Sequence, residues 1–125
     1  MNENEISYKI RGAIFNVYNT FGAGLLESVY VMALASDLRK EGLDVKLEVP
    51  IPVYYNEEKL AVGFRIDILV ENKVAIEVKS VENLAEVHHK QVLTYLKLAN
   101  LKLGILVNFN VAEIKQGIFR KVNNL

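Results

Sequence analysis

Two acidic side chains and one lysine interrupt a stretch of the chain that is otherwise apolar. The two segments concerned read RIDILV, which contains Asp67, and VAIEVK, which contains Glu77 and Lys79. Their alternation is typical of strands and turns these three side chains away from the apolar face. If the turn between the segments is centred on Asn72, Asp67 lies directly across from Glu77, with β-carbons about 4.5–5.5 Å apart.

Two carboxylates in directly opposed positions repel each other, and placing them among apolar residues is costly without a partner. A hard divalent cation with oxygen ligands is the simplest compensation, and Lys79 would add a second positive charge. A turn of even length would instead put Asp67 and Glu77 on opposite faces. The alternative interpretation is a solvated strand face, on which charged and apolar residues alternate without binding anything.

Helical and alternating periodicities predict the elements that would position these side chains. Gly22-Ala23-Gly24 separates two helices. Pro50 and Pro52 place the first strand at a sheet edge or give it a bulge, because proline donates no ladder hydrogen bond. The predicted elements are a helix over 5–20 with Asn4 as its N-cap, a second helix ending before Gly42, strands over 45–55, 59–70 and 73–80, a helix over 84–99 and a strand over 101–109.

This order predicts an α/β fold in which helices flank one mixed β-sheet. The tail around Gly117 is ambiguous, and a short final hairpin strand is the preferred interpretation. The length of 125 residues predicts a single domain over 1–125.

Composition excludes several classes of site and of partner. The absence of cysteine excludes disulfides, thiolate zinc sites and cysteine nucleophiles. No apolar run approaches the roughly 20 residues of a membrane span, and the first residues lack the features of a signal peptide, so we expect a cytoplasmic protein without a membrane partner. Fifteen basic and fifteen acidic residues argue against a non-specific nucleic-acid coat and restrict any such contact to a local patch.

The motif formed by Asp67, nine intervening residues and Glu77-Val78-Lys79 resembles the core of the PD-(D/E)XK nuclease superfamily. More narrowly, residues 24–30 (GLLESVY) resemble the signature of the GxxExxY proteins, a family placed in that superfamily. The resemblance extends over about 5–122, including 49–55, 63–65 and 91–96.

The resemblance implies a restriction-endonuclease-like core of order ααβββαβ and hydrolysis of phosphodiester bonds, in DNA rather than RNA, with Mg²⁺ or Mn²⁺. It implies that Asp67, Glu77 and the Val78 carbonyl ligate the ion, with Glu27 completing the shell. Lys79 would position or activate the attacking water. Glu27 has an alternative role, since with Gly24 as N-cap it would occupy the third helical position, where a capping glutamate is favoured.

Gln91 and Tyr95, one helical turn apart, resemble the Gln-xxx-Tyr element of RecB-like nucleases, which lines the site and orients the lysine or a phosphate. The alternative is that Tyr95 belongs to the core and Gln91 to its boundary. Arg65 shares a strand face with Asp67, so we expect it to pair with that acid or to contact phosphate.

Two further pairs of residues receive structural interpretations. His88 and His89 point about 100° apart on a helix, so at most one can face a site, and solvent or cap roles are favoured for both. Tyr54 and Tyr55 are interpreted as strand packing rather than as platforms for stacked bases.

Three functions remain open at this point. The first is a small metal-dependent DNA nuclease. The second is a dimeric repair nuclease similar to the archaeal Holliday junction resolvases, although the chain lacks a strongly basic face. The third is a nuclease-derived binding or assembly module with a protein partner. A homodimer would use the proline-bearing edge strand or the apolar helices.

Overall fold

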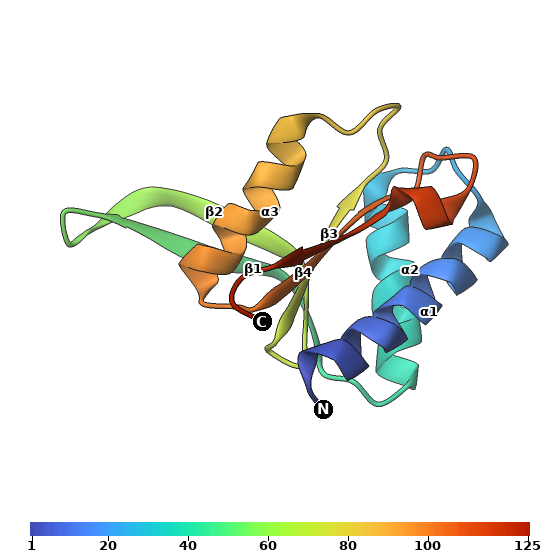
Figure 1. Ribbon diagram of the computed structural model, residues 1–125, viewed down its shortest axis with the longest axis horizontal. Coiled ribbons are helices and arrows are strands. Elements are labelled where there is room, and N and C mark those ends of the chain that lie inside the picture. The colour runs from blue at the N-terminus through green and yellow to red at the C-terminus, as the bar shows by residue number, and fades with distance from the viewer.

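The computed structural model describes residues 1–125 and shows a five-stranded mixed sheet with helices on both faces (Figure 1). The strands lie in chain order, β1-β2-β3-β4-β5, and only the β3–β4 pair is parallel. The predicted order of elements is confirmed, including the short final strand. The elements are α1 (Glu3–Phe21), α2 (Glu27–Lys40), β1 (Val45–Tyr55), β2 (Glu58–Val70), β3 (Val74–Lys79), α3 (Glu86–Ala99), β4 (Leu103–Asn108), the 3₁₀ helix η1 (Ile114–Gly117) and β5 (Ile118–Val122).

Helix α1 begins two residues earlier than predicted because its N-cap is Asn2 and not Asn4. The Asn2 side chain accepts a hydrogen bond from the Glu5 N–H (2.8 Å), and the Glu5 carboxylate accepts one from the Asn2 N–H (2.9 Å). This reciprocal capping satisfies two of the N–H groups that a helix start leaves without partners.

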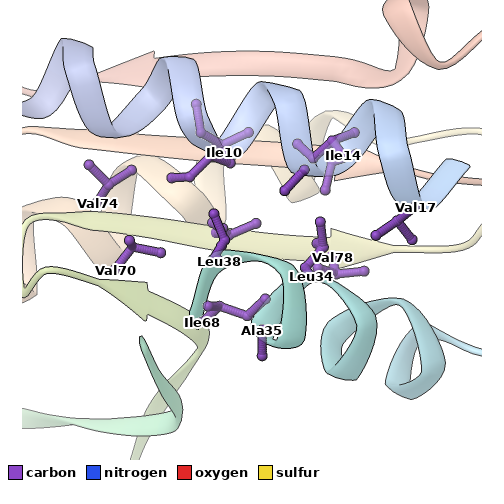
Figure 2. Packing of buried hydrophobic residues seen from close by; sticks show 14 of the residues in the cluster. Ile10, Ile14, Val17, Leu34, Ala35, Leu38, Ile68, Val70, Val74 and Val78 are labelled. Carbon is purple, nitrogen blue, oxygen red and sulfur yellow. The ribbon is translucent and has the colours of Figure 1, made fainter. Parts of the chain in front are cut away.

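The larger part of the core lies between α1, α2 and one face of the sheet (Figure 2). Ile10 and Ile14 of α1 and Leu34 and Leu38 of α2 are fully buried there against apolar strand residues such as Val78. Their i, i+4 spacing is the apolar stripe from which the helices were predicted. A smaller cluster joins Val92 and Leu96 of α3 to the opposite face, with Ile51, Ile66, Leu69, Ala75 and Leu106.

The β1–β2 ribbon changes from one helical layer to the other partway along its length. Ile68 packs in the cluster under α1 and α2, whereas Ile66 packs in the cluster under α3. In a regular strand these two residues would face the same side. The change occurs at Glu48, which has a left-handed backbone (φ 48°), and at Asp67 opposite it, where the ladder of paired residues is interrupted.

Beyond this point the ribbon projects past α3, and its hairpin tip lies far from the helices (Figure 1). β1 is an edge strand and its register shifts between Pro52 and Tyr54, so the prolines have both predicted consequences. The turn consists of Asn56 and Glu57, both with positive φ. Tyr54 and Tyr55 are 61% and 68% exposed, so their interpretation as strand packing is wrong.

None of the helices has the length and apolar character needed to cross a membrane.

Candidate active site

The hairpin of β2 and β3 has the register that the sequence analysis required. Val70 pairs with Val74 and Ile68 pairs with Ile76, so the pairing is symmetric about residue 72, in the middle of a three-residue loop. Glu71 and Asn72 have φ values of 54° and 55°, which a tight turn of this kind demands.

The ladder between the two strands ends one pair before Asp67 and Glu77 would meet. The Asp67 carboxylate instead accepts a hydrogen bond from the Val78 N–H (2.9 Å). β3 continues beyond this point paired with β4 alone, Glu77 beside Leu106 and Lys79 beside Asn108. The two strands therefore fork, and Asp67 lies in the fork with its carboxylate against β3.

Glu77 is a buried acid, only 9% exposed. Its pKa is raised to about 8, first by burial and then by the negative charge of neighbouring Asp67, while Lys79 acts in the opposite direction. A carboxyl group held neutral by burial and by a like charge is typical of a functional site. Asp67, Glu77 and Lys79 thus interact electrostatically, as their spacing predicted.

Glu27 reaches the same end of β3 from another element. Its carboxylate accepts a hydrogen bond from the Ser80 N–H (3.1 Å), directly after Lys79. The N-cap of α2 is Leu26, and no side chain caps this helix, so Glu27 is the first helical residue. The capping interpretation of Glu27, which required Gly24 as N-cap, is therefore wrong.

Tyr30 explains the geometry of the segment that precedes α2. It is fully buried, and its ring stacks on Phe109 with centroids 4.1 Å apart. The hydroxyl donates to the Gly22 carbonyl (2.6 Å) and accepts from the Leu25 N–H (3.1 Å). Gly24 allows the turn, because its φ is +98°. In the same GLLESVY segment, Glu27 contacts the end of β3 and Tyr30 holds the turn in place.

Helix α3 brings Tyr95 to the acidic pair. The pKa of Tyr95 is raised by burial and then by the charges of Glu77 and Asp67, so the phenol lies near both. Its ring contacts Phe64 of β2, with centroids 5.0 Å apart. Gln91 is half-buried one turn earlier, and its proposed role in the site stays a prediction.

His88 has the cap role that was favoured for it, whereas His89 packs against an aromatic ring. His88 accepts a hydrogen bond from the Ala85 N–H (3.1 Å) through its Nδ1 atom, which is a cap of α3. His89 packs edge-on against Phe119 of β5, with centroids 4.9 Å apart.

Arg65 does not pair with Asp67. Its guanidinium lies 4.0 Å from the Glu48 carboxylate, and both side chains are largely exposed (71% and 75%). Glu48 lies across the ribbon from Asp67, and the two line a hollow of about 370 Å³ together with Ser28, Val31, Met32 and Leu47. An ion pair this exposed is weak and easily exchanged, so Arg65 is available to an anionic ligand.

The oxygen donors of Asp67 and Glu77 fit a hard divalent cation. Burial and the charge of Asp67 both disfavour the charged form of Glu77, and a bound cation would offset both effects. No three His, Cys, Asp or Glu side chains are gathered closely enough to hold a metal ion by themselves. The ligand set that includes Glu27 and the Val78 carbonyl stays a prediction.

Sequence reasoning missed two polar residues near this site. Asn108 is 3% exposed and bonds to the backbone of Val81 in both directions, at 3.1 and 2.9 Å, which fixes the chain beyond Ser80. Its position within an apolar run was the available signal. Glu48 was passed over as an ordinary outward-facing strand residue, and no local pattern marks its left-handed backbone.

A family model described as the PD-(D/E)XK nuclease superfamily matches residues 4–121. A comparison with curated proteins finds no match. Among solved structures, the crystal structure of SSO0001 is similar to this chain, with a TM-score of 0.58 and 23% identity, over 79% of this chain and 51% of that chain. The chain thus spans about half the length of SSO0001, and the likeness shows a shared fold.

Proposed function

Because the chain belongs to the PD-(D/E)XK nuclease superfamily, we propose that it is a metal-dependent nuclease that hydrolyses phosphodiester bonds in DNA. The observation that supports this most is the approach of Asp67 to buried Glu77, with Lys79 two residues further along β3. Membership of the GxxExxY family within the superfamily is consistent with the arrangement around Glu27 and Tyr30 and stays a prediction.

Asp67 and Glu77 would hold Mg²⁺ or Mn²⁺, with the Val78 carbonyl as a further ligand. Such an ion, when bound, polarises a phosphoryl oxygen and acidifies the attacking water. The hydrogen bond from the Val78 N–H to Asp67 fixes one carboxylate of the pair against the strand that carries the other. Glu27, held at Ser80, would complete the shell from α2.

Lys79 would place its ammonium group beside the reacting phosphate. There it positions the water and offsets the negative charge that develops in the transition state, an effect commonly worth about 2.7–4 kcal/mol for one preorganised donor. Tyr95 and Gln91 would line the site from α3, and Arg65 would contact a neighbouring phosphate of the substrate.

The test measures Mn²⁺ binding by calorimetry and cleavage of DNA substrates on the same protein samples. We expect Asp67→Asn/Glu77→Gln to lose both, because both carboxylate charges are removed at constant shape. Glu41→Gln, which removes an exposed charge at the far end of α2, serves as the matched control and should retain both. If the double variant binds Mn²⁺ as wild type does, the metal site is elsewhere.

Linear, single-stranded and branched DNA belong in the same assay. A marked preference for four-way junctions, together with a dimer in solution, would favour the resolvase-like alternative. If the protein neither binds the metal nor cleaves DNA, the remaining alternative is a nuclease-derived interaction module that acts through a protein partner.

A further inference from the structure

One face of the projecting β1–β2 ribbon forms a continuous surface that begins at the candidate active site. Side chains on this face alternate with those that pack under α3, and cross-strand pairing sets which residues share it: Pro50 is opposite Arg65, Pro52 is opposite Gly63, and Tyr54 is opposite Lys59. We call these six residues, exposed throughout, the ribbon face.

The ribbon face leads to Asp67 through Glu48. Arg65 lies 4.0 Å from the Glu48 carboxylate, and Glu48 lines the same hollow as Asp67. From Lys59 to Asp67 the strand covers eight residues, or roughly 25 Å at about 3.3 Å per residue. A ligand that follows the ribbon would arrive at the acidic pair.

The middle of the ribbon face is a shallow depression, because the two prolines and the glycine there have small or rigid side chains. Pro50, Pro52 and Gly63 line a depression of about 320 Å³ between Arg65 and Lys59. A β-carbon at Gly63 would collide with the backbone carbonyl of Ile51, so glycine is needed for the close approach of the two strands.

The charges on the ribbon face suit a phosphate backbone. Arg65 and Lys59 stand at the two ends of the depression. No acid lines the depression, and Glu48 forms only the loose, exposed pair with Arg65. Glu58 is the partner of Tyr55 and lies on the opposite side of the ribbon. In a chain with net charge zero, this is a local cationic line rather than a basic surface.

We propose that the ribbon face binds a single strand of nucleic acid and directs it to Asp67 and Glu77; this rests on the proposed function and names its substrate class. Arg65 and Lys59 bind successive parts of the backbone, and the exposed ring of Tyr54 stacks on an unpaired base. A duplex would present two backbones and stacked bases, for which one line of two cations and a single aromatic ring are poorly suited.

The test measures binding of a labelled oligothymidylate of about 15 nucleotides and of a duplex of equal length, in Ca²⁺ to occupy the acidic pair. We expect the single strand to bind more tightly. Tyr54→Ala should weaken its binding about fivefold or more, as loss of one stacked base does. Tyr55→Ala is the matched control, since this exposed tyrosine is the next residue and faces the other side.

Salt dependence tests the cations separately. Each phosphate pairing on a single strand adds about −0.7 to the slope of log K against log salt. Arg65→Ala and Lys59→Ala should each reduce the slope by that amount, whereas Lys40→Ala, at the exposed end of α2, should not. Glu48→Gln should strengthen binding, because it releases Arg65.

Equal affinity for single strand and duplex, or equal effects of Tyr54→Ala and Tyr55→Ala, would overturn the proposal. Binding through the ribbon face without cleavage in Mg²⁺ would support it and refute the nuclease proposal. If the protein cleaves DNA but no ribbon-face variant changes its binding, the ribbon-face proposal is refuted and the nuclease proposal is supported.

Discussion

The buried acid Glu77 should make the metal-free protein less stable as the pH rises. Its pKa is 4.5 when unperturbed and about 8 in the folded protein, so between these values the folded state holds a proton that the unfolded state has lost. The free energy of unfolding is therefore highest, as far as Glu77 is concerned, below pH 4.5. It falls by about 1.4 kcal/mol per pH unit from there up to about pH 8.

The total loss is of the order of 5 kcal/mol, comparable to the whole stability of many domains. Burial is the first cause of the shift and the charge of Asp67 the second, so we assign the smaller share of this loss to that charge. Glu77→Gln should remove most of the pH dependence, and Asp67→Asn only the smaller share.

Urea unfolding in EDTA at pH 5.5, 7 and 8.5 measures this directly. Glu77→Gln should be the more stable protein, by the smallest margin at pH 5.5 and by a margin that grows up to about pH 8. Added Mg²⁺ should restore the stability of the wild-type protein at high pH and leave the stability of Glu77→Gln nearly unchanged. Parallel pH profiles of the two proteins would refute the assignment of this charge to Glu77.

Three further substitutions test other parts of the structure. Lys79→Met should abolish cleavage in a folded protein that still binds Mn²⁺. Retained cleavage would refute the proposed role of the lysine. Tyr30→Phe keeps the stacked ring but removes two hydrogen bonds at the turn before α2, so the urea midpoint should report a loss of about 1–3 kcal/mol. Asn108→Ala should cost a similar amount, because it leaves the partly buried backbone N–H and carbonyl of Val81 without these partners; an unchanged midpoint would contradict this.

The register that brings Asp67 close to Glu77 was predictable because it depends on short-range rules. Alternation within each strand sets which side chains share a face, and a three-residue loop centred on Asn72 sets the register. The same holds for α1 and α2, whose buried residues follow a helical stripe. The resemblance to the nuclease superfamily was read from such local motifs, and a family model over residues 4–121 confirms it.

Other parts of the site depend on contacts between residues far apart in the chain. Glu27 and Ser80 are separated by 53 positions, so the local sequence left both a metal-ligand role and a capping role open for the acid. Arg65 pairs with Glu48 across the ribbon rather than with its nearer neighbour Asp67, since the left-handed backbone of Glu48 alters the geometry at that point.

The sequence by itself determined the order of elements, the register of the central hairpin and the three charged side chains that it presents. Only the tertiary structure decided that the β1–β2 ribbon crosses between helical layers, that its far half is exposed, and that α2 and α3 both reach the fork. Periodicity describes how a residue faces within its own element. How elements meet depends on side-chain packing between them, which no local pattern encodes.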